Sequence, residues 1–438
     1  MTVRIPKAID LSGGLRALLA TDDTLPLVDV EFVLRTGAVH DPRGQEGLTR
    51  MTWRVARMGT EALRAEELEE EIAALGGRLA IQIAPSSVRL SGVVIARNLE
   101  PFFALLAEIL QRPALRAADL TRAKREVRDE FRQRRDSDRS LAGRAFRTTL
   151  YGTHPYARPL TGTPESLRRI DVAALKGHHR RHLHASNLIV GVAGPLSRGD
   201  LRRLLAKYLS DLPGGRAPKE PHRAPKVRRG RHLVVVNKPG RSQSPVLIGG
   251  LGIVLGHPSH PALSIGNAAF GGMFTSRLTQ EVRELRGWSY GATSTIGADR
   301  MRDAWIMSTA PSSEYLRECI ELELSLLEQF SKKGITAAEF RRTRGHLIES
   351  HCFEVDTAGK RLSLALEEEL YGLPAGTIVR WPSQLRRATH ARVNGAIRRW
   401  IPRRDLTLAL VATARTALPE LKKIPGIDSV TVIPYRKM

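Results

Sequence analysis

The 438-residue chain contains few cysteines, few aromatic residues and no long apolar run. Its two cysteines, Cys319 and Cys352, cannot build a disulfide framework and lack the paired spacing of a zinc site, so we expect two buried thiols. No run reaches the roughly 18 apolar residues that span a bilayer, and residues 1–23 lack the apolar core of a signal peptide. These absences predict a cytoplasmic protein without membrane contacts.

The chain also lacks the pattern of a nucleic-acid-binding protein, although its formal net charge is +24. Its arginines are spread along every segment, and aromatic residues, which would stack on bases, make up only 5% of the chain. A GC-rich genome would produce the same excess of arginine without any function. The remaining interpretation of the charge is a positive surface that attracts an acidic partner or acidic peptides. We therefore do not expect nucleic acid as a partner. Salt-sensitive retention of the protein on DNA would instead support a nucleic-acid-binding function.

A phosphate-binding loop is also absent, because neither a G-x-G-x-x-G nor a GK[ST] pattern follows Gly271 and Gly272. A tight turn or a close approach of two backbone segments explains this glycine pair better.

Apolar periodicity is present, and it occurs twice in the same order of elements. The first half opens with a strand, a turn and a strand over residues 15–36, continues through several helices and closes with the strand 188–193 and a helix. The second half opens and closes in the same way, and its last strand is Leu406–Val411. We therefore predict an α+β protein with two sequence-related αβ domains, each a mixed sheet packed with helices. The domains span residues 1–211 and 232–438, and the Pro- and Gly-rich segment 212–231 is the predicted linker.

The most informative stretch runs from Gly271 to Tyr290 and reads GGMFTSRLTQEVRELRGWSY. Ser276 is placed to cap a helix that ends near Gly287. The apolar face of this predicted helix consists of Leu278, Val282 and Leu285. Arg283 and Tyr290 stand at its end and at the start of the following strand, where a guanidinium and a hydroxyl can direct hydrogen-bond donors at one carbonyl oxygen.

This stretch resembles the second-domain motif of the pitrilysin/insulinase family of zinc metallopeptidases, in the branch that includes the mitochondrial processing peptidases and small bacterial heterodimers. An Arg and a Tyr seven positions apart contact the substrate peptide in that family, and they fall on Arg283 and Tyr290. Residues 154–171, residues 184–196 and the strand after Gln243 resemble further family segments. The resemblance implies a substrate-binding role for Arg283 and Tyr290, and two domains that form half of a clamp.

The zinc motif of that family, His-x-x-Glu-His, is lost from this chain. In the matching frame the two His positions hold Arg50 and Arg54, and the Glu position holds Trp53. A guanidinium has no lone pair for a metal, and an indole cannot take a proton from a metal-bound water. The resemblance therefore implies that this chain binds no metal and has no catalytic residue of its own. The third ligand position falls on Glu130, which we expect to form a salt bridge with Arg50 or Arg54.

Two other groups of histidines do not replace the lost site. His346 and His351 are five residues apart, so on a helix their imidazoles would point about 140° apart. The densest cluster falls at a helix end where the family has no metal ligands, and we expect it to serve packing or to be solvated. It consists of His178, His179, His182 and His184.

In the heterodimeric members of the family, the zinc and the Arg/Tyr pair of one working site come from different chains. The resemblance thus implies a zinc-free subunit that is inactive alone and pairs with a zinc-bearing homologous subunit. Arg283 and Tyr290 would then bind the peptide substrate at the zinc of that subunit. A non-enzymatic scaffold with the same fold remains the alternative, whereas the residues at positions 50, 53 and 54 oppose an active homodimer.

Overall fold

The computed structural model describes residues 4–216 and 223–438, so residues 217–222 of the predicted linker lie outside the described part. The chain forms two compact units that are not contiguous in sequence. The described part of the first unit consists of residues 4–129, 159–216 and 352–380. The second consists of residues 130–158, 223–351 and 381–438.

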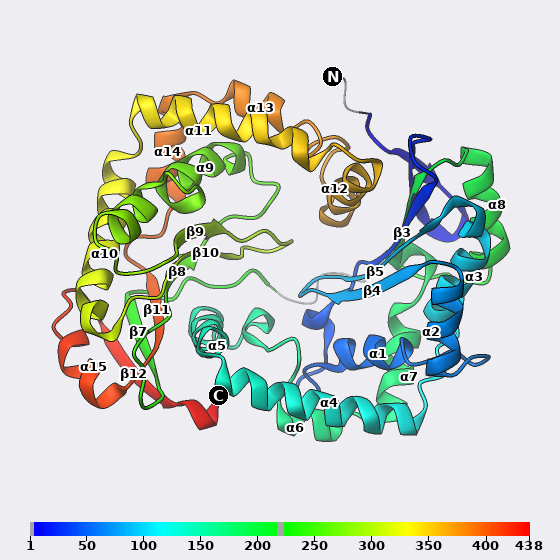
Figure 1. The fold of residues 1–438 in the computed structure, drawn as a ribbon, viewed down its shortest axis with the longest axis horizontal. Coiled ribbons are helices and arrows are strands. Elements are labelled where there is room, and N and C mark those ends of the chain that lie inside the picture. The colour runs from blue at the N-terminus through cyan, green and yellow to red at the C-terminus, as the bar shows by residue number, and fades with distance from the viewer. Residues whose placement is uncertain (1–3, 217–222) are drawn as a thin grey trace. The chain divides into compact units, whose positions relative to one another are not determined.

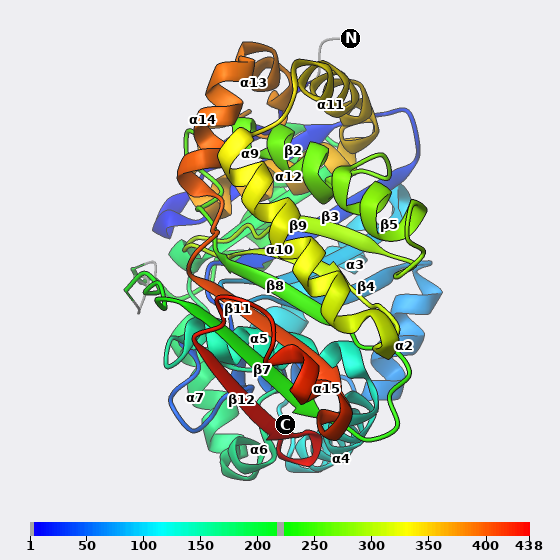
Figure 2. The same cartoon turned by 90° about the vertical axis from the view of Figure 1, so that its left-hand side faces the viewer.

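Each unit contains a six-stranded mixed sheet, and five strands of the two sheets follow the same order, with only the edge strands β1 and β12 placed differently in the chain. The first has the order β1-β2-β6-β3-β5-β4 and the second β12-β7-β11-β8-β10-β9. The central pairs β2–β6 and β7–β11 are parallel, whereas the pairs that follow toward β4 and β9 are antiparallel. Figure 2 shows β12, β7, β11 and β8 side by side. The predicted pair of related αβ folds with mixed sheets is confirmed.

The strands of the first unit are β1 (Lys7–Asp10), β2 (Arg16–Thr21), β3 (Leu27–Leu34), β4 (Arg78–Ile83), β5 (Val88–Ile95) and β6 (Leu188–Gly194). Those of the second are β7 (Arg231–Asn237), β8 (Val246–Leu251), β9 (Ala292–Ile296), β10 (Ala304–Thr309), β11 (Leu406–Ala412) and β12 (Ser429–Pro434). The edge strands differ, because β1 runs antiparallel to β2 and β12 runs parallel to β7.

The helices of the first half of the chain are α1 (Leu48–Ala56), α2 (Ala65–Ala74), α3 (Leu99–Gln111), α4 (Ala117–Asp136), α5 (Asp138–Tyr151), α6 (Pro164–Arg169), α7 (Val172–His182) and α8 (Arg198–Leu209). Those of the second half are α9 (His260–Asn267), α10 (Leu316–Lys333), α11 (Ala337–Ser350), α12 (Ala358–Tyr371), α13 (Trp381–Arg387), α14 (His390–Trp400) and α15 (Ala414–Leu421). Within the described ranges, no helix combines the length and apolar character needed to cross a membrane.

Each half of the chain contributes one helix to the unit that contains the other half's sheet. Helix α5 packs on β7, β8 and β11 of the second unit, and α12 packs on β2, β3 and β6 of the first (Figure 1). The predicted boundaries at residues 211 and 232 therefore mark the two halves of the sequence, while the compact units exchange segments.

Helix α12 packs closely because its apolar residues form one stripe and the strand below has a glycine. Leu362 and Leu366, four residues apart, are fully buried in a cluster with Val33 and Ile189 of the sheet. A Cβ atom at Gly191 of β6 would lie 2.7 Å from Leu366 Cδ1. The absence of a side chain at this position lets the helix lie directly on the strand.

Helix α5 is held in the second unit by a buried lysine. The ammonium of Lys238 donates to Asp138 Oδ1 at 2.7 Å and to the carbonyl oxygens of Arg135 and Asp136, at 3.0 and 2.9 Å. This cation therefore satisfies the carbonyl end of α4 and the first residue of α5 together.

The expectation of two buried thiols holds for Cys319 and is wrong for Cys352. Burial, which disfavours the thiolate, raises the pKa of Cys319. Cys352 lies beyond the end of α11, in the 3-10 turn His351–Glu354, in which His351 is the buried residue and Cys352 faces solvent.

Candidate functional site

The predicted substrate-binding stretch lies in the second unit, against the edge strand β9. One π-helical segment, Ala268–Gly272, leads into this stretch, and a second, Thr279–Glu284, lies within it. Asn267 Nδ2 donates to Ser294 O at 2.9 Å, and Thr279 Oγ1 donates to Ala292 O at 3.0 Å. Both acceptors belong to β9, whose only neighbour in the described sheet is β10. The last residue of α9 and the stretch itself thus satisfy carbonyl groups on the open edge of the sheet.

A glycine and a buried polar network fix this contact. A Cβ atom at Gly271 would lie 2.6 Å from Ser294 N, so only glycine allows this approach. Asn267 Oδ1 accepts from Ser294 Oγ at 2.7 Å and from Trp305 Nε1 at 2.8 Å. The predicted close backbone approach is confirmed.

The helix predicted after Ser276 is present, but residues 279–284 are π-helical, whereas the spacing of the apolar residues suggested an α-helix. Leu285 N donates to Gln280 O at 2.9 Å, an i to i+5 bond, and the wider turn changes which side chains face inward. Leu278 and Val282 are fully buried, whereas Leu285 is 70% exposed. Gly287 has a φ of +64° and ends the segment, as predicted.

Arg283 and Tyr290 come together on the surface, and a third residue joins them. The guanidinium carbon of Arg283 lies 4.8 Å from the ring centroid of Tyr290 and 4.7 Å from that of Phe274. Tyr290 is 88% exposed and Phe274 62% exposed. We call Phe274, Arg283 and Tyr290 the arginine–aromatic cluster. Its rings attract the cation through their π faces and leave N–H donors of the guanidinium available in its plane.

Two further contacts orient the cluster. Arg283 Nε lies 3.4 Å from Glu284 Oε1. The buried Ser289 hydroxyl donates to Gly291 O at 2.6 Å and accepts from Ala310 N at 2.9 Å, which fixes the backbone on both sides of Tyr290. Sequence reasoning missed Phe274, whose only signal is an aromatic residue between a glycine pair and a polar turn.

The degenerate zinc frame lies on α1 of the first unit. Trp53 is 3% exposed, and its ring centroid lies 5.9 Å from that of His179. Arg54 Nη2 lies 2.7 Å from Glu126 Oε2. An indole packed in the interior and a guanidinium in an ion pair do not fit zinc. Across residues 4–216 and 223–438, no three His, Cys, Asp or Glu side chains gather in a way that suits a metal ion.

Glu126, which pairs with Arg54, lies on α4 one helical turn before Glu130. The carboxylate that pairs with Arg54 is thus that of Glu126, one helical turn away from Glu130, the position of the family's third zinc ligand. A salt bridge from Glu130 to Arg50 or Arg54 stays a prediction.

The histidine cluster on α7 packs in the interior. His178 Nε2 lies 3.1 Å from Thr49 Oγ1, and His179 Nε2 lies 2.7 Å from Leu110 O. Burial lowers the pKa of His178 well below its usual value and lowers the pKa of His182 to about 4, so these imidazoles are neutral near pH 7. His184 lies beyond the end of α7, is only partly buried, and contacts Ser186 Oγ through Nδ1 at 3.1 Å.

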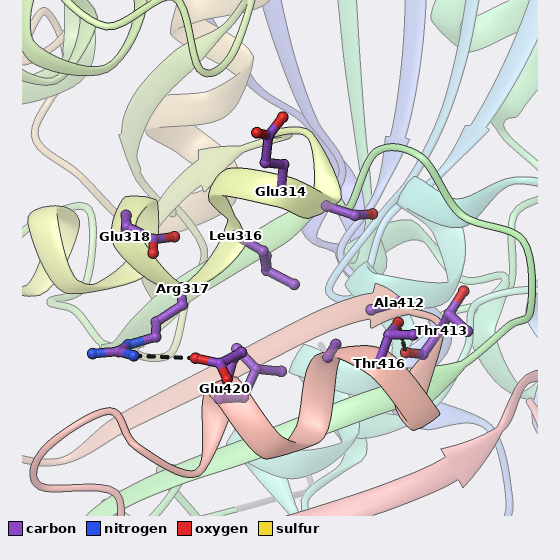
Figure 3. A pocket seen from close by; sticks show the side chains of 11 residues that line it. Glu314, Leu316, Arg317, Glu318, Ala412, Thr413, Thr416 and Glu420 are labelled. Carbon is purple, nitrogen blue, oxygen red and sulfur yellow. Dashed lines mark hydrogen bonds and ion pairs between the residues drawn. The ribbon is translucent and has the colours of Figure 1, made fainter.

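A separate cavity of about 280 Å³ lies in the second unit between the first turn of α10 and helix α15 (Figure 3). Arg317 on its rim is committed to Glu420 at 3.1 Å and to Glu321 at 3.0 Å. The cavity contains neither Arg283 nor Tyr290, and its one cationic side chain, Arg317, is already paired with Glu420.

Comparison with known sequences places both halves of the chain in one peptidase family. Residues 16–164 match the family described as Insulinase (Peptidase family M16), and residues 169–347 match the Peptidase M16 inactive domain. An uncharacterized zinc protease of Mycobacterium tuberculosis is 25% identical over 401 residues, which cover 91% of each chain. The non-peptidase homolog YmxG of Helicobacter pylori is 21% identical over 394 residues, or 89% of this chain and 90% of that protein.

Solved structures show the same fold. The peptidase M16 inactive domain from Pseudomonas fluorescens superimposes with a TM-score of 0.88 at 23% identity, over 93% of this chain and 97% of that one. A protease from Helicobacter pylori superimposes with a TM-score of 0.86 at 18% identity, over 94% and 100% of the two chains.

Proposed function

Since the chain belongs to the insulinase family of peptidases, peptidase family M16, we propose that it is the zinc-free subunit of a heterodimeric metallopeptidase. Its arginine–aromatic cluster binds the peptide substrate at a zinc site that a homologous partner subunit supplies. The observation that carries this proposal is the exposed contact of Arg283 with Tyr290 and Phe274, two large rings that remain open to solvent.

The side chains in the zinc frame support a site in which one chain binds the metal and this chain binds the peptide. Trp53 is buried and Arg54 forms an ion pair, so this α1 neither ligates a metal nor activates water. The residues that bind peptide in the family persist, however, on a rigid platform of buried hydrogen bonds. A chain with only the second set of groups completes a site whose metal is held elsewhere.

The chemistry of this chain's own residues is positioning and charge stabilisation. In-plane N–H groups of Arg283 and the hydroxyl of Tyr290 donate hydrogen bonds to carbonyl oxygens of a bound peptide. A donor that faces the scissile carbonyl binds more strongly as negative charge develops on that oxygen, which lowers the barrier. The π-helical platform holds these donors without rearrangement during the reaction.

The test combines this chain with the homologous zinc-bearing subunit and measures cleavage of a peptide library by each chain alone and by the mixture. We expect activity in the mixture only. Arg283→Ala or Tyr290→Phe should lower kcat/KM roughly tenfold or more, because each removes a donor to developing charge. Arg415→Ala is the control, since Arg415 is an exposed arginine on α15 of the same unit and lines neither the cluster nor its surroundings.

Two results would contradict the proposal. Activity of the partner that is indifferent to this chain would make the chain a scaffold or an unrelated protein. Activity that needs this chain but survives both substitutions at positions 283 and 290 would assign it to assembly alone.

A further inference from the structure

A polar groove of about 620 Å³ lies in the second unit beside the arginine–aromatic cluster. Thr275 lines it and directly follows Phe274 in the chain, so the groove begins one residue from the cluster. Gln280 and Glu281 of the second π-helical segment line the same side, and α10 and α11 supply the other. A peptide bound to the cluster can therefore continue into this groove.

The carboxylates that line the groove are already paired. Glu339 accepts two hydrogen bonds from Arg277, at 2.7 and 2.6 Å, and one from Thr336 N at 2.7 Å. Glu281 accepts from Arg286 at 2.6 Å. These pairs neutralise both carboxylates and the cation of Arg277, so they contribute little net charge to a ligand.

Arg342 on α11 is the remaining charged group of the groove. Its side chain is exposed, and among the described residues no carboxylate lies within ion-pair distance of it. Gln280 and Gln329 add side-chain amides, each of which can both donate to and accept from a peptide bond. The groove thus combines one uncompensated cation with the groups that suit a polypeptide backbone.

We propose that this groove binds an acidic side chain of the substrate peptide, with Arg342 as its charge partner, while the neighbouring part of the peptide contacts the arginine–aromatic cluster. The identity of the ligand as a substrate rests on the proposed function. Because the guanidinium of Arg342 is open to water, its ion pair with the acidic side chain contributes only a small part of the binding free energy. We expect peptides with a Glu at this position to bind roughly fivefold more tightly than those with a Gln.

The experiment uses short fluorescent peptides in which a single Glu is moved through each position of an apolar sequence, with Gln at the same positions as the matched set. Binding to this chain is measured by anisotropy at low and high salt, and turnover is measured in the mixture with the zinc-bearing subunit. Glu at one position should tighten binding and lower KM roughly fivefold without changing kcat, and the gain should weaken with salt. Arg342→Gln should abolish the preference, whereas Arg341→Gln, on the adjacent exposed residue outside the groove, should keep it.

The outcomes separate this inference from the proposed function. A preference for Glu that survives Arg342→Gln, or no preference at all, would overturn the inference even if activity still depends on Arg283. A loss of association between the two subunits on Arg342→Gln would overturn it as well, because the groove would then be an interface. An intact Arg342-dependent preference without any activity in the mixture would instead reject the proposed function and leave the acidic-peptide site.

Discussion

Replacing Phe274 with alanine should weaken the peptide-binding role of Arg283 without abolishing it. The guanidinium contacts two exposed rings at nearly equal distances, 4.7 and 4.8 Å, so each ring holds it by a comparable amount. An exposed cation–π contact contributes about 0.5–1 kcal/mol. At 1.36 kcal/mol per tenfold change in rate, loss of the Phe274 ring corresponds to a fall of about two- to fivefold in kcat/KM.

The assay is steady-state cleavage by the mixed subunits, with the tenfold or larger loss in Arg283→Ala as the upper reference. Phe274→Tyr keeps a ring at the same place and should restore most of the activity. Phe353→Ala is the matched control, because Phe353 is similarly exposed, at 68%, and belongs to the first unit. Thermal unfolding of the variants checks that the fold is unchanged, since removal of an exposed ring should cost little stability.

The reasoning would be refuted if Phe274→Ala behaved like Phe353→Ala, because Arg283 would then not need the ring. A loss as large as that of Arg283→Ala would also refute it, since a single cation–π contact cannot supply that effect.

Three other predictions concern the platform and the core. Gly271→Ala places a Cβ atom 2.6 Å from Ser294 N, so it should lower the free energy of unfolding by about 1–3 kcal/mol in urea titrations and weaken peptide binding. Gly345→Ala, where nothing lies within 4 Å of the added Cβ atom, should reproduce neither effect. Lys238→Met removes the donor to Asp138 Oδ1 and to two carbonyl groups at the end of α4, while Asp138 Oδ2 keeps its contact with Arg241. It should cost about 1–3 kcal/mol by the same measurement, and an unchanged midpoint would show that the cation is not needed there. Burial raises the pKa of the Glu323 carboxyl from 4.5 to about 8, so between these pH values the folded protein keeps a proton that the unfolded chain releases. The stability of the protein relative to Glu323→Gln should therefore fall as pH rises from about 4.5 to about 8. Parallel profiles of stability against pH for the two proteins would contradict this.

The order of helices and strands could be predicted from the sequence because apolar spacing reports which face of an element is buried. Apolar spacing could not reveal, however, which sheet covers that face. Leu362 and Leu366 mark an apolar stripe on α12, but only the structure places this stripe on β2, β3 and β6, far away in the chain. The same limit explains why two contiguous domains were predicted where the compact units exchange α5 and α12.

Within the site, the pair Arg283 and Tyr290 was found through a resemblance, and the structure shows the two side chains in contact. Their role in binding the substrate stays a prediction. The π-helical turn was not predicted, because the spacing of Leu278, Val282 and Leu285 fits an α-helix equally well. That turn exposes Leu285. Phe274 was missed for a related reason, since one aromatic residue in a turn does not show which cation it contacts.

The most direct test of the central claim asks whether this chain touches the peptide that another chain cleaves. A photoreactive phenylalanine analogue at position 290 would be illuminated in the mixed complex, after a chelator has stopped turnover, in the presence of a fluorescent substrate peptide. The same analogue at Tyr315, an exposed tyrosine that stacks on Trp288, is the control. We predict crosslinking of the peptide to position 290 that an unlabelled substrate displaces, and none at position 315. Absence of a displaceable crosslink at position 290 in a mixture that cleaves the peptide before chelation would contradict the account.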